Sequence, residues 1–284
     1  MKAFDHYTPQ SINEAIELIS NFNGTGIVIA GGTDVHLKMK TGLVSPEAVI
    51  NIKQIPELKG LTYDKKKGAR IGALTTLREL TRSPDISGYY PALCRAAGLM
   101  ASEQIRSFAT IGGNLCNAAP SADLAPPLIA LNGQMTIIGK SRSREIFVED
   151  FFSGPGSTTL SEGELVQEIT IPPPTGKTIF IKHSPREYMD ISVVCIALNI
   201  ELVDGTCKDT KIVLGAVAPT PLRIEKAEKI LIGQKITSAA ISKAAAITAK
   251  ECSPIDDVRG SAAYRRRMVE VLTRRGLTSL LQAE

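Results

Sequence analysis

Apolar and polar residues alternate between strand-like and helical spacing through the first half of the chain. The pair Ser11 and Glu14 is typical of a capping box, and apolar residues then recur at helical spacing. A β-branched apolar run over residues 26–30 ends at glycines, which predicts a buried strand. By the same criteria we expect strands at residues 48–52, 70–74 and 164–171, a short helix opening at Thr76 and another helix at 91–101.

The pattern changes after the triple proline at residues 172–174. Proline donates no hydrogen bond to a sheet and disfavours helix in the residue before it, so we place a domain boundary here, with domains at 1–175 and 176–284. A small antiparallel sheet followed by helices predicts an α+β fold. We expect strands at 178–183, 193–202 and 211–217, a hairpin turn at Asp204-Gly205, and helices at 224–231, 238–250 and 261–275.

Composition fits a folded, globular chain. Its 284 residues are 43% hydrophobic and 22% charged, which excludes a disordered chain. The five cysteines are dispersed without CxxC pairs, so we expect a reducing compartment and no metal ligands. No stretch of the sequence suits a membrane helix or a signal peptide, and we therefore expect a cytoplasmic protein without membrane insertion.

The net charge of +4 is modest, and the densest basic cluster lies near the C-terminus. Apolar residues at helical spacing surround it, so we expect its arginines on the outer face of a helix, solvated or paired with a neighbouring subunit. No interleaved aromatic residues accompany them, so nucleic acid binding is not expected. The cluster comprises Arg265, Arg266, Arg267, Arg274 and Arg275.

Two glycine-rich segments are the candidate binding elements. The first, residues 30–34 (AGGTD), directly follows the predicted strand at 26–30. Tandem glycines accept positive φ and permit close approach of a ligand, and successive N–H groups can form a nest for a phosphate. Such a pair is also compatible with a plain tight turn.

The second segment, residues 110–114 (TIGGN), has the same composition and predicts a second nest. Ser121 or Asp123 is expected to cap an apolar helix at 124–131, with two prolines in its first turn. Two nests suit a diphosphate, one for each phosphoryl group. Neither segment matches the dinucleotide-fold or P-loop glycine pattern, so both of those enzyme classes are disfavoured.

Several longer segments carry a resemblance to a known family. AGGTDV (30–35) and ATIGGNLCNAAPSADLAPPLIAL (109–131) resemble the FAD-binding subunit of the molybdenum hydroxylases, as do QIRSFATIGGN (104–114), SGPGSTTL (153–160), FIKHSPREYMDIS (180–192) and GAVAPTPLR (215–223). Among relatives, the bacterial xanthine dehydrogenase subunit looks most similar, through MDIS and APTPxR.

The resemblance implies a two-lobed FAD-binding domain of the vanillyl-alcohol-oxidase type and a smaller α+β C-terminal domain. It places 29–36 and the second segment around the diphosphate, Asn117 and Asp123 at sugar hydroxyls, and Lys182 and Met100 beside the flavin. The cofactor-binding residues it implies are Ile29, Ala30, Gly31, Gly32, Thr33, Asp34, Val35, His36, Met100, Thr110, Gly113, Asn114, Asn117, Asp123, Val166 and Lys182.

Charge and exposure leave alternatives for some of these residues. Arg106 and Lys182 are candidate cations for the diphosphate, and a cation near the ring would favour reduced flavin. Asp34 could instead merely turn its loop, and Lys182 could lie on a strand surface. His36 and His183 suit structural roles, and Cys116 suits a small buried thiol.

The function implied by the resemblance is electron transfer by an oxidoreductase subunit. FAD on this chain would take electrons from two [2Fe–2S] clusters on a small partner subunit and pass them to NAD or another acceptor. A large subunit would hold the molybdopterin and oxidise a purine or other N-heteroaromatic substrate. No catalytic acid, base or nucleophile is expected here. The alternatives are a carbon monoxide or aldehyde dehydrogenase complex, a stand-alone flavoprotein oxidoreductase, and a non-enzymatic nucleotide-binding module.

Overall fold

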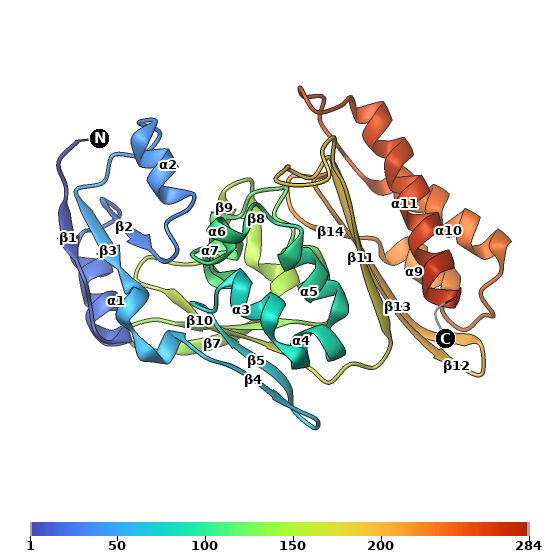
Figure 1. Cartoon of the computed structure of the whole chain (residues 1–284), viewed down its shortest axis with the longest axis horizontal. Helices are drawn as coiled ribbons and strands as arrows, with labels where there is room; N and C mark the ends of the chain where they lie inside the picture. The colour runs from blue at the N-terminus through green and yellow to red at the C-terminus, as the bar shows by residue number, and fades with distance from the viewer. Residues whose placement is uncertain (1, 283–284) are drawn as a thin grey trace.

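The computed structural model describes residues 2–282, which form three lobes in chain order (Figure 1). The first lobe is a parallel sheet of order β1-β3-β2 with a helix, α1, whose Ile12, Ala15 and Ile16 are buried. Ser11 caps α1 by accepting a hydrogen bond from the Glu14 amide, but the Glu14 carboxylate accepts from the Gln10 amide and not from that of Ser11, so the predicted capping box is only half formed. The elements are β1 (Asp5–Tyr7), α1 (Ile12–Asn21), β2 (Gly26–Ile29), α2 (Val35–Lys40) and β3 (Ala48–Asn51).

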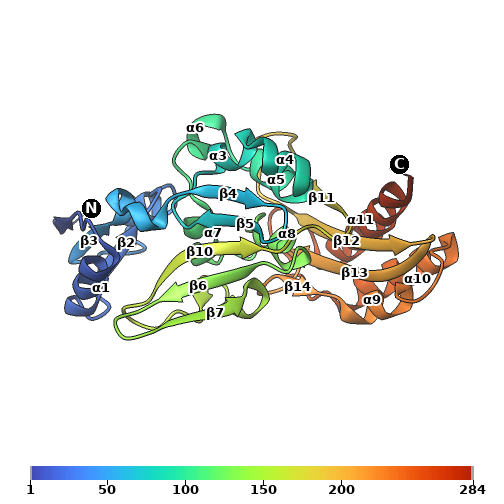
Figure 2. The same ribbon diagram turned by 90° about the horizontal axis from the view of Figure 1, so that it is seen from below.

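The central lobe is a five-stranded antiparallel sheet of order β4-β5-β10-β6-β7, covered on one face by short helices (Figure 2). Thr76 and Glu79 form a capping box at the start of α3, where the sequence predicts that a short helix opens. The strands are β4 (Leu61–Asp64), β5 (Gly68–Gly72), β6 (Gln134–Ile138), β7 (Ser143–Phe147) and β10 (Leu165–Ile171), with a small pair β8 (Phe152–Gly154) and β9 (Ser157–Thr158). The helices are α3 (Leu77–Arg82), α4 (Pro84–Tyr89), α5 (Pro91–Gly98), α6 (Glu103–Arg106), α7 (Ile111–Asn117) and α8 (Ala125–Ala130), with 3-10 turns η1 (Ile52–Gln54), η2 (Pro56–Leu58) and η3 (Val148–Phe151).

The third lobe is a four-stranded antiparallel sheet with helices on its outer face. Its predicted hairpin turn is present: Asp204 and Gly205 have φ of 51° and 73°, between the paired residues Val203 and Thr206. The elements are β11 (Lys177–His183), β12 (Val194–Val203), β13 (Thr206–Gly215), β14 (Leu222–Arg223), α9 (Glu225–Leu231), α10 (Ser238–Glu251) and α11 (Ala262–Gln282).

The sheet of the third lobe packs against the central lobe with one face and against α9–α11 with the other. Because strand side chains alternate between faces, Cys195 and Ala197 join the core of the central lobe, whereas Ile196 and Leu198 join the core beneath α9–α11. The Asn199 amide also donates to the Ala130 carbonyl at the end of α8. The predicted α+β class, with a two-lobed first part and a smaller antiparallel C-terminal part, is confirmed.

Two local predictions are wrong. Neither Ser121 nor Asp123 caps α8, because Leu124 occupies the cap position in helical conformation without a side-chain bond. Arg265 is not on the outer face of its helix: it is buried, pairs with Asp257 and donates to two main-chain carbonyls. Within residues 2–282 we find no helix with the length and apolar content needed to cross a membrane.

Candidate functional site

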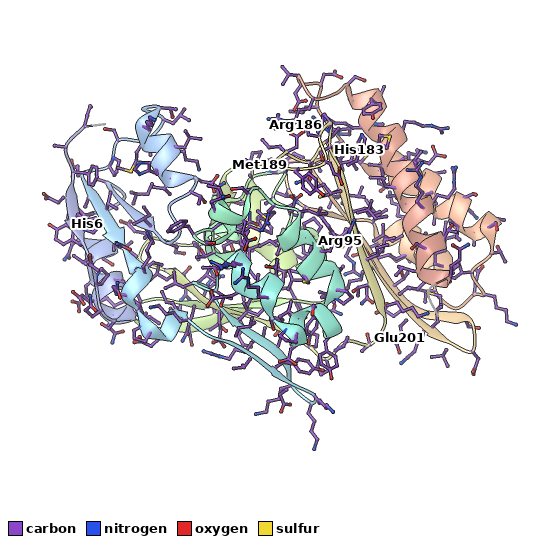
Figure 3. All side chains as sticks on the ribbon, in the orientation of Figure 1. His6, Arg95, His183, Arg186, Met189 and Glu201 are labelled. Atoms are coloured by element: carbon purple, nitrogen blue, oxygen red, sulfur yellow. The ribbon has the colours of Figure 1, made fainter. Side chains whose placement is uncertain are left out.

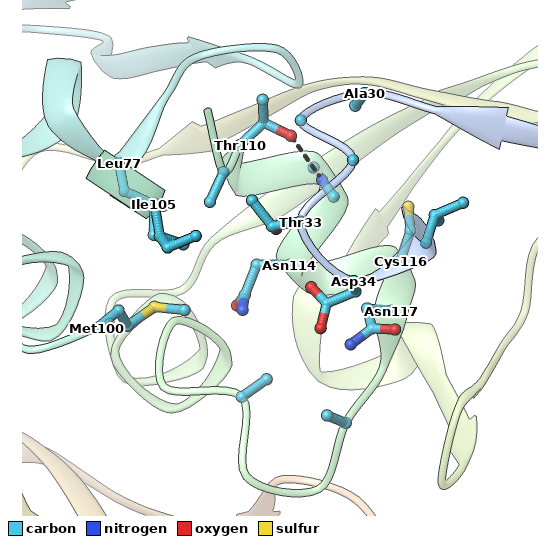
Figure 4. Close-up of a pocket in the computed structure, with 18 of the residues that line it drawn as sticks. Ala30, Thr33, Asp34, Leu77, Met100, Ile105, Thr110, Asn114, Cys116 and Asn117 are labelled. Atoms are coloured by element: carbon cyan, nitrogen blue, oxygen red, sulfur yellow. Dashed lines mark hydrogen bonds between the residues drawn. The ribbon is translucent and has the colours of Figure 1, made fainter. Parts of the chain in front are cut away.

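A cavity of about 660 Å³ lies where the three lobes meet, a size that suits a large cofactor. Its walls come from the β2–α2 connection, α7 and the following loop, β10, β11 and the loop after β11. Figure 4 shows polar side chains of Asp34, Asn114 and Asn117 on one side and the apolar Leu77, Met100 and Ile105 on another. The site therefore combines an apolar wall with a cluster of hydrogen-bonding groups.

The first glycine segment forms the kind of loop that the sequence predicts. Gly32 has a φ of +79°, which explains the need for glycine, and its carbonyl accepts the first helical bond from the His36 amide at 3.0 Å. At Gly31 a Cβ would collide with the main-chain carbonyl of Phe108. Within residues 2–282, the amides of Gly32, Thr33 and Asp34 have no protein acceptor, so this loop offers three successive donors.

The second glycine segment is not a nest. It is the first turn of α7, and neither Gly112 nor Gly113 has positive φ. The Gly112 amide donates to the Ala73 carbonyl at 2.9 Å, and the Gly113 amide donates to the Thr110 hydroxyl at 3.0 Å, which Figure 4 marks. Gly112 packs so closely on Ala73 that a side chain would not fit. This segment therefore serves packing and shape, and its amides are already used.

Asn114 is the polar group that α7 directs to the cavity. Its side-chain Oδ1 is buried and has no hydrogen-bond partner among the described residues. A buried polar atom without a partner is costly unless something else satisfies it. Together with the three unused amides of the first loop, this atom fits a bound ligand rich in polar groups, as FAD is.

A buried ion pair forms the end of the cavity contributed by the third lobe. Lys182 Nζ lies 2.8 Å from Asp123 Oδ2, and both side chains are only about 5% exposed. Ser192 donates to the other oxygen of the same carboxylate. Burial raises the pKa of Asp123 in spite of the lysine beside it. Lys182 is therefore a neutralised cation and not an isolated one.

Most residues that the sequence associates with the cofactor line this cavity, and two do not. Ile29 and His36 lie outside the lining, and His36 is exposed on α2. The lining residues are Ala30, Gly31, Gly32, Thr33, Asp34, Val35, Met100, Thr110, Gly113, Asn114, Asn117, Asp123, Val166 and Lys182. Which atoms of a cofactor they contact stays a prediction.

Two other candidate side chains differ from what the sequence suggests, and a third agrees with it. Arg106 does not line the cavity; its guanidinium donates to the carbonyls of Met100 at 2.6 Å and Ala101 at 3.0 Å, and so fixes the turn between α5 and α6. Cys116 is exposed, contrary to the expectation of a buried thiol. His183 lies 2.8 Å from the Tyr264 hydroxyl, which agrees with a structural role.

Sequence reasoning missed two contributions to the cavity. Lys38, on the second turn of α2, lines it together with Asp34; the spacing of four residues on a helix was an available signal. The loop after β11 adds Met189, Asp190 and Ile191, and Figure 3 shows Met189 on the side of this loop toward the central lobe. Within residues 2–282, no group of histidine, cysteine and acidic side chains is arranged to hold a metal ion.

Comparison with known proteins identifies the family. The FAD binding domain in molybdopterin dehydrogenase matches residues 2–174, and the CO dehydrogenase flavoprotein C-terminal domain matches residues 179–280. The chain belongs to the FAD-binding subunits of the molybdenum hydroxylases. Members of this family are FAD-containing oxidoreductase subunits.

Relatives with different substrates match almost the whole chain. The carbon monoxide dehydrogenase medium chain of Afipia carboxidovorans is 32% identical over 97% of this chain and 96% of its own length. The putative xanthine dehydrogenase FAD-binding subunit of Escherichia coli is 28% identical over 98% of this chain and 96% of its own length. The structure of carbon monoxide dehydrogenase from Hydrogenophaga pseudoflava superimposes with a TM-score of 0.95, at 31% identity, and covers 99% of this chain and 98% of that one.

Proposed function

We propose that this chain is the electron-transfer subunit of a cytoplasmic molybdenum hydroxylase complex that oxidises a purine or related N-heteroaromatic substrate and reduces NAD. Its partners are a large molybdopterin-binding chain and a small chain with two [2Fe–2S] clusters. Bound FAD supplies the step between one-electron carriers and a two-electron acceptor. This chain's own residues bind the cofactor, orient it and shield it from water.

The cavity at the junction of the three lobes carries this proposal. It offers three unused main-chain amides, an unsatisfied Asn114 oxygen and an apolar wall, in a chain whose family is defined by FAD binding. The N-heteroaromatic substrate is supported by the xanthine dehydrogenase relative. The carbon monoxide dehydrogenase relative supports the second candidate, a carbon monoxide-oxidising complex with another acceptor.

The test begins with the tagged chain purified gently from its host with whatever subunits accompany it. We expect a large molybdopterin chain, a small iron–sulfur chain and FAD. Xanthine is then compared with carbon monoxide as reductant, and NAD with an artificial dye as acceptor. Recovery of this chain alone with FAD would refute the complex and favour a stand-alone flavoprotein, and recovery without flavin would refute both.

A matched pair of glycine variants tests whether NAD reduction takes place at FAD bound to this chain. Gly32 and Gly42 have nearly the same φ, +79° and +77°, so a valine introduces similar backbone strain at each, but only Gly32 lines the cavity. In the Gly32→Val complex we expect loss of FAD and of NAD reduction, while substrate still bleaches the iron–sulfur clusters. The Gly42→Val complex should keep both activities. NAD reduction by the FAD-free complex would overturn the proposal.

A further inference from the structure

The charged side chains that line the cavity are mostly compensated within the protein. Three of the four carboxylates form ion pairs, and so does one of the two lysines. The remaining carboxylate is Asp34, and the remaining cation is Lys38; neither forms an ion pair among residues 2–282. The compensated pairs are Asp123–Lys182 at 2.8 Å, Glu164–Arg144 at 2.8 Å and Asp190–Arg186 at 3.4 Å.

Lys38 is held in place by a neutral partner. Its Nζ donates to the Asn117 Oδ1 at 2.6 Å, across 79 residues of sequence, and thereby joins α2 to the end of α7. An amide oxygen orients the ammonium group without cancelling its charge, and the ammonium has two further donors. Lys38 is half-buried, so this charge is less screened than that of a free surface lysine.

Lys38 also stands beside the free donors of the first loop. Its amide donates to the Asp34 carbonyl at 3.0 Å, which sets it one helical turn after Gly32, Thr33 and Asp34. Lys38 lines the same cavity as these unused amides, and a cation combined with successive main-chain donors is the chemistry that binds a phosphate group. Asp34, which can only accept hydrogen bonds when ionised, suits sugar hydroxyls rather than phosphate.

We infer that Lys38 is the binding cation for the diphosphate of FAD, held by Asn117, and that Lys182 does not serve this purpose because Asp123 neutralises it. This inference rests on the proposed function, since it requires FAD in this cavity. Arg106, the other cation that the sequence suggests, does not compete for this role, because it donates to main-chain carbonyls and does not line the cavity.

The test compares Lys38→Met with Lys40→Met in the isolated full chain freed of flavin. Both variants remove one positive charge from α2, but Lys40 is exposed and does not line the cavity. Titration is followed by quenching of flavin fluorescence, with FAD and with riboflavin, which has no phosphate. We expect Lys38→Met to weaken FAD binding about tenfold and to leave the affinity for riboflavin unchanged. At high salt the difference in FAD affinity between the variant and the unmodified chain should become smaller.

Three results would overturn the inference about Lys38. Equal weakening of FAD binding and riboflavin binding would assign Lys38 a structural role. Equal loss of FAD affinity in the Lys38 and Lys40 variants would show that only the net positive charge of α2 matters. Unchanged FAD affinity in the Lys38→Met variant would show that Lys38 takes no part in FAD binding. Lys38→Arg should retain FAD affinity and serves if the methionine variant does not fold. Failure of the unmodified chain to bind FAD would instead refute the proposed function itself.

Discussion

The buried Asp123–Lys182 pair makes a quantitative prediction about the stability of the chain. Both side chains are about 5% exposed, so removal of one partner leaves the other buried without its counter-charge. Such a loss costs about 3–5 kcal/mol of unfolding free energy. We therefore expect Lys182→Met and Asp123→Asn each to lower stability by this order, and the double variant to cost at least about 1 kcal/mol less than the sum.

The pH dependence of Lys182→Met provides a second measure. Burial already raises the pKa of Asp123 in the folded chain, and removal of the lysine takes away the charge that opposes this shift. A carboxyl whose folded pKa exceeds its unfolded value binds more protons when folded, so its contribution to stability is present at low pH and is lost as pH rises. The cost of Lys182→Met should therefore be larger at pH 8 than at pH 5.

Urea unfolding of the flavin-free chain, followed by circular dichroism at both pH values, measures these effects. Lys229→Met is the matched control, because its pair with Glu225 is exposed and should contribute less than about 1 kcal/mol. The reasoning is refuted if Lys182→Met costs no more than Lys229→Met, or if the Asp123 and Lys182 effects are simply additive.

Two further substitutions, each with a control, test other contacts that hold the fold together. Gly31→Ala should lower the unfolding free energy by about 2–3 kcal/mol, because its Cβ meets the Phe108 carbonyl; Gly88→Ala, with open space around it, should be neutral or stabilising in the same urea titration. Arg265→Met should cost about 3 kcal/mol, because it removes the buried donor of two main-chain carbonyls and breaks the pair with Asp257. Arg266→Met, on the exposed face of α11, should change the melting temperature little.

Elements that depend on neighbouring residues could be predicted from the sequence. The capping box at Thr76 and Glu79 and the hairpin at Asp204-Gly205 are complete within a few residues, and both are present in the structure. The same holds for the glycine at position 32, whose positive φ follows from a sharp turn directly after a strand. Local chemistry determines these features, and distant parts of the chain do not alter them.

Contacts between distant residues could not be predicted in this way. Asp123 is of a residue type that commonly caps helices, and it lies just before α8. Its partner, Lys182, lies 59 residues further along the chain, and Asp123 forms an ion pair with it and does not cap the helix. The sequence of the TIGGN segment predicts a second phosphate-binding nest, but its amides donate to protein acceptors such as the Ala73 carbonyl, which lies near only in the folded chain. A glycine pair therefore indicates close approach, and only the structure shows whether a ligand or the protein itself approaches.

The third lobe completes the wall of the cavity, and contacts within this lobe hold that wall in place. Ser192 bonds to Asp123, and the next residue, Val193, offers its carbonyl to the buried Arg265 of α11. Arg265 also holds Ala216, whose amide donates to the Pro120 carbonyl in the loop that forms the cavity wall. Because both connections lead from α11 to Asp123 or to the loop that carries it, the C-terminal helix helps to position this wall of the cavity although it does not line the cavity.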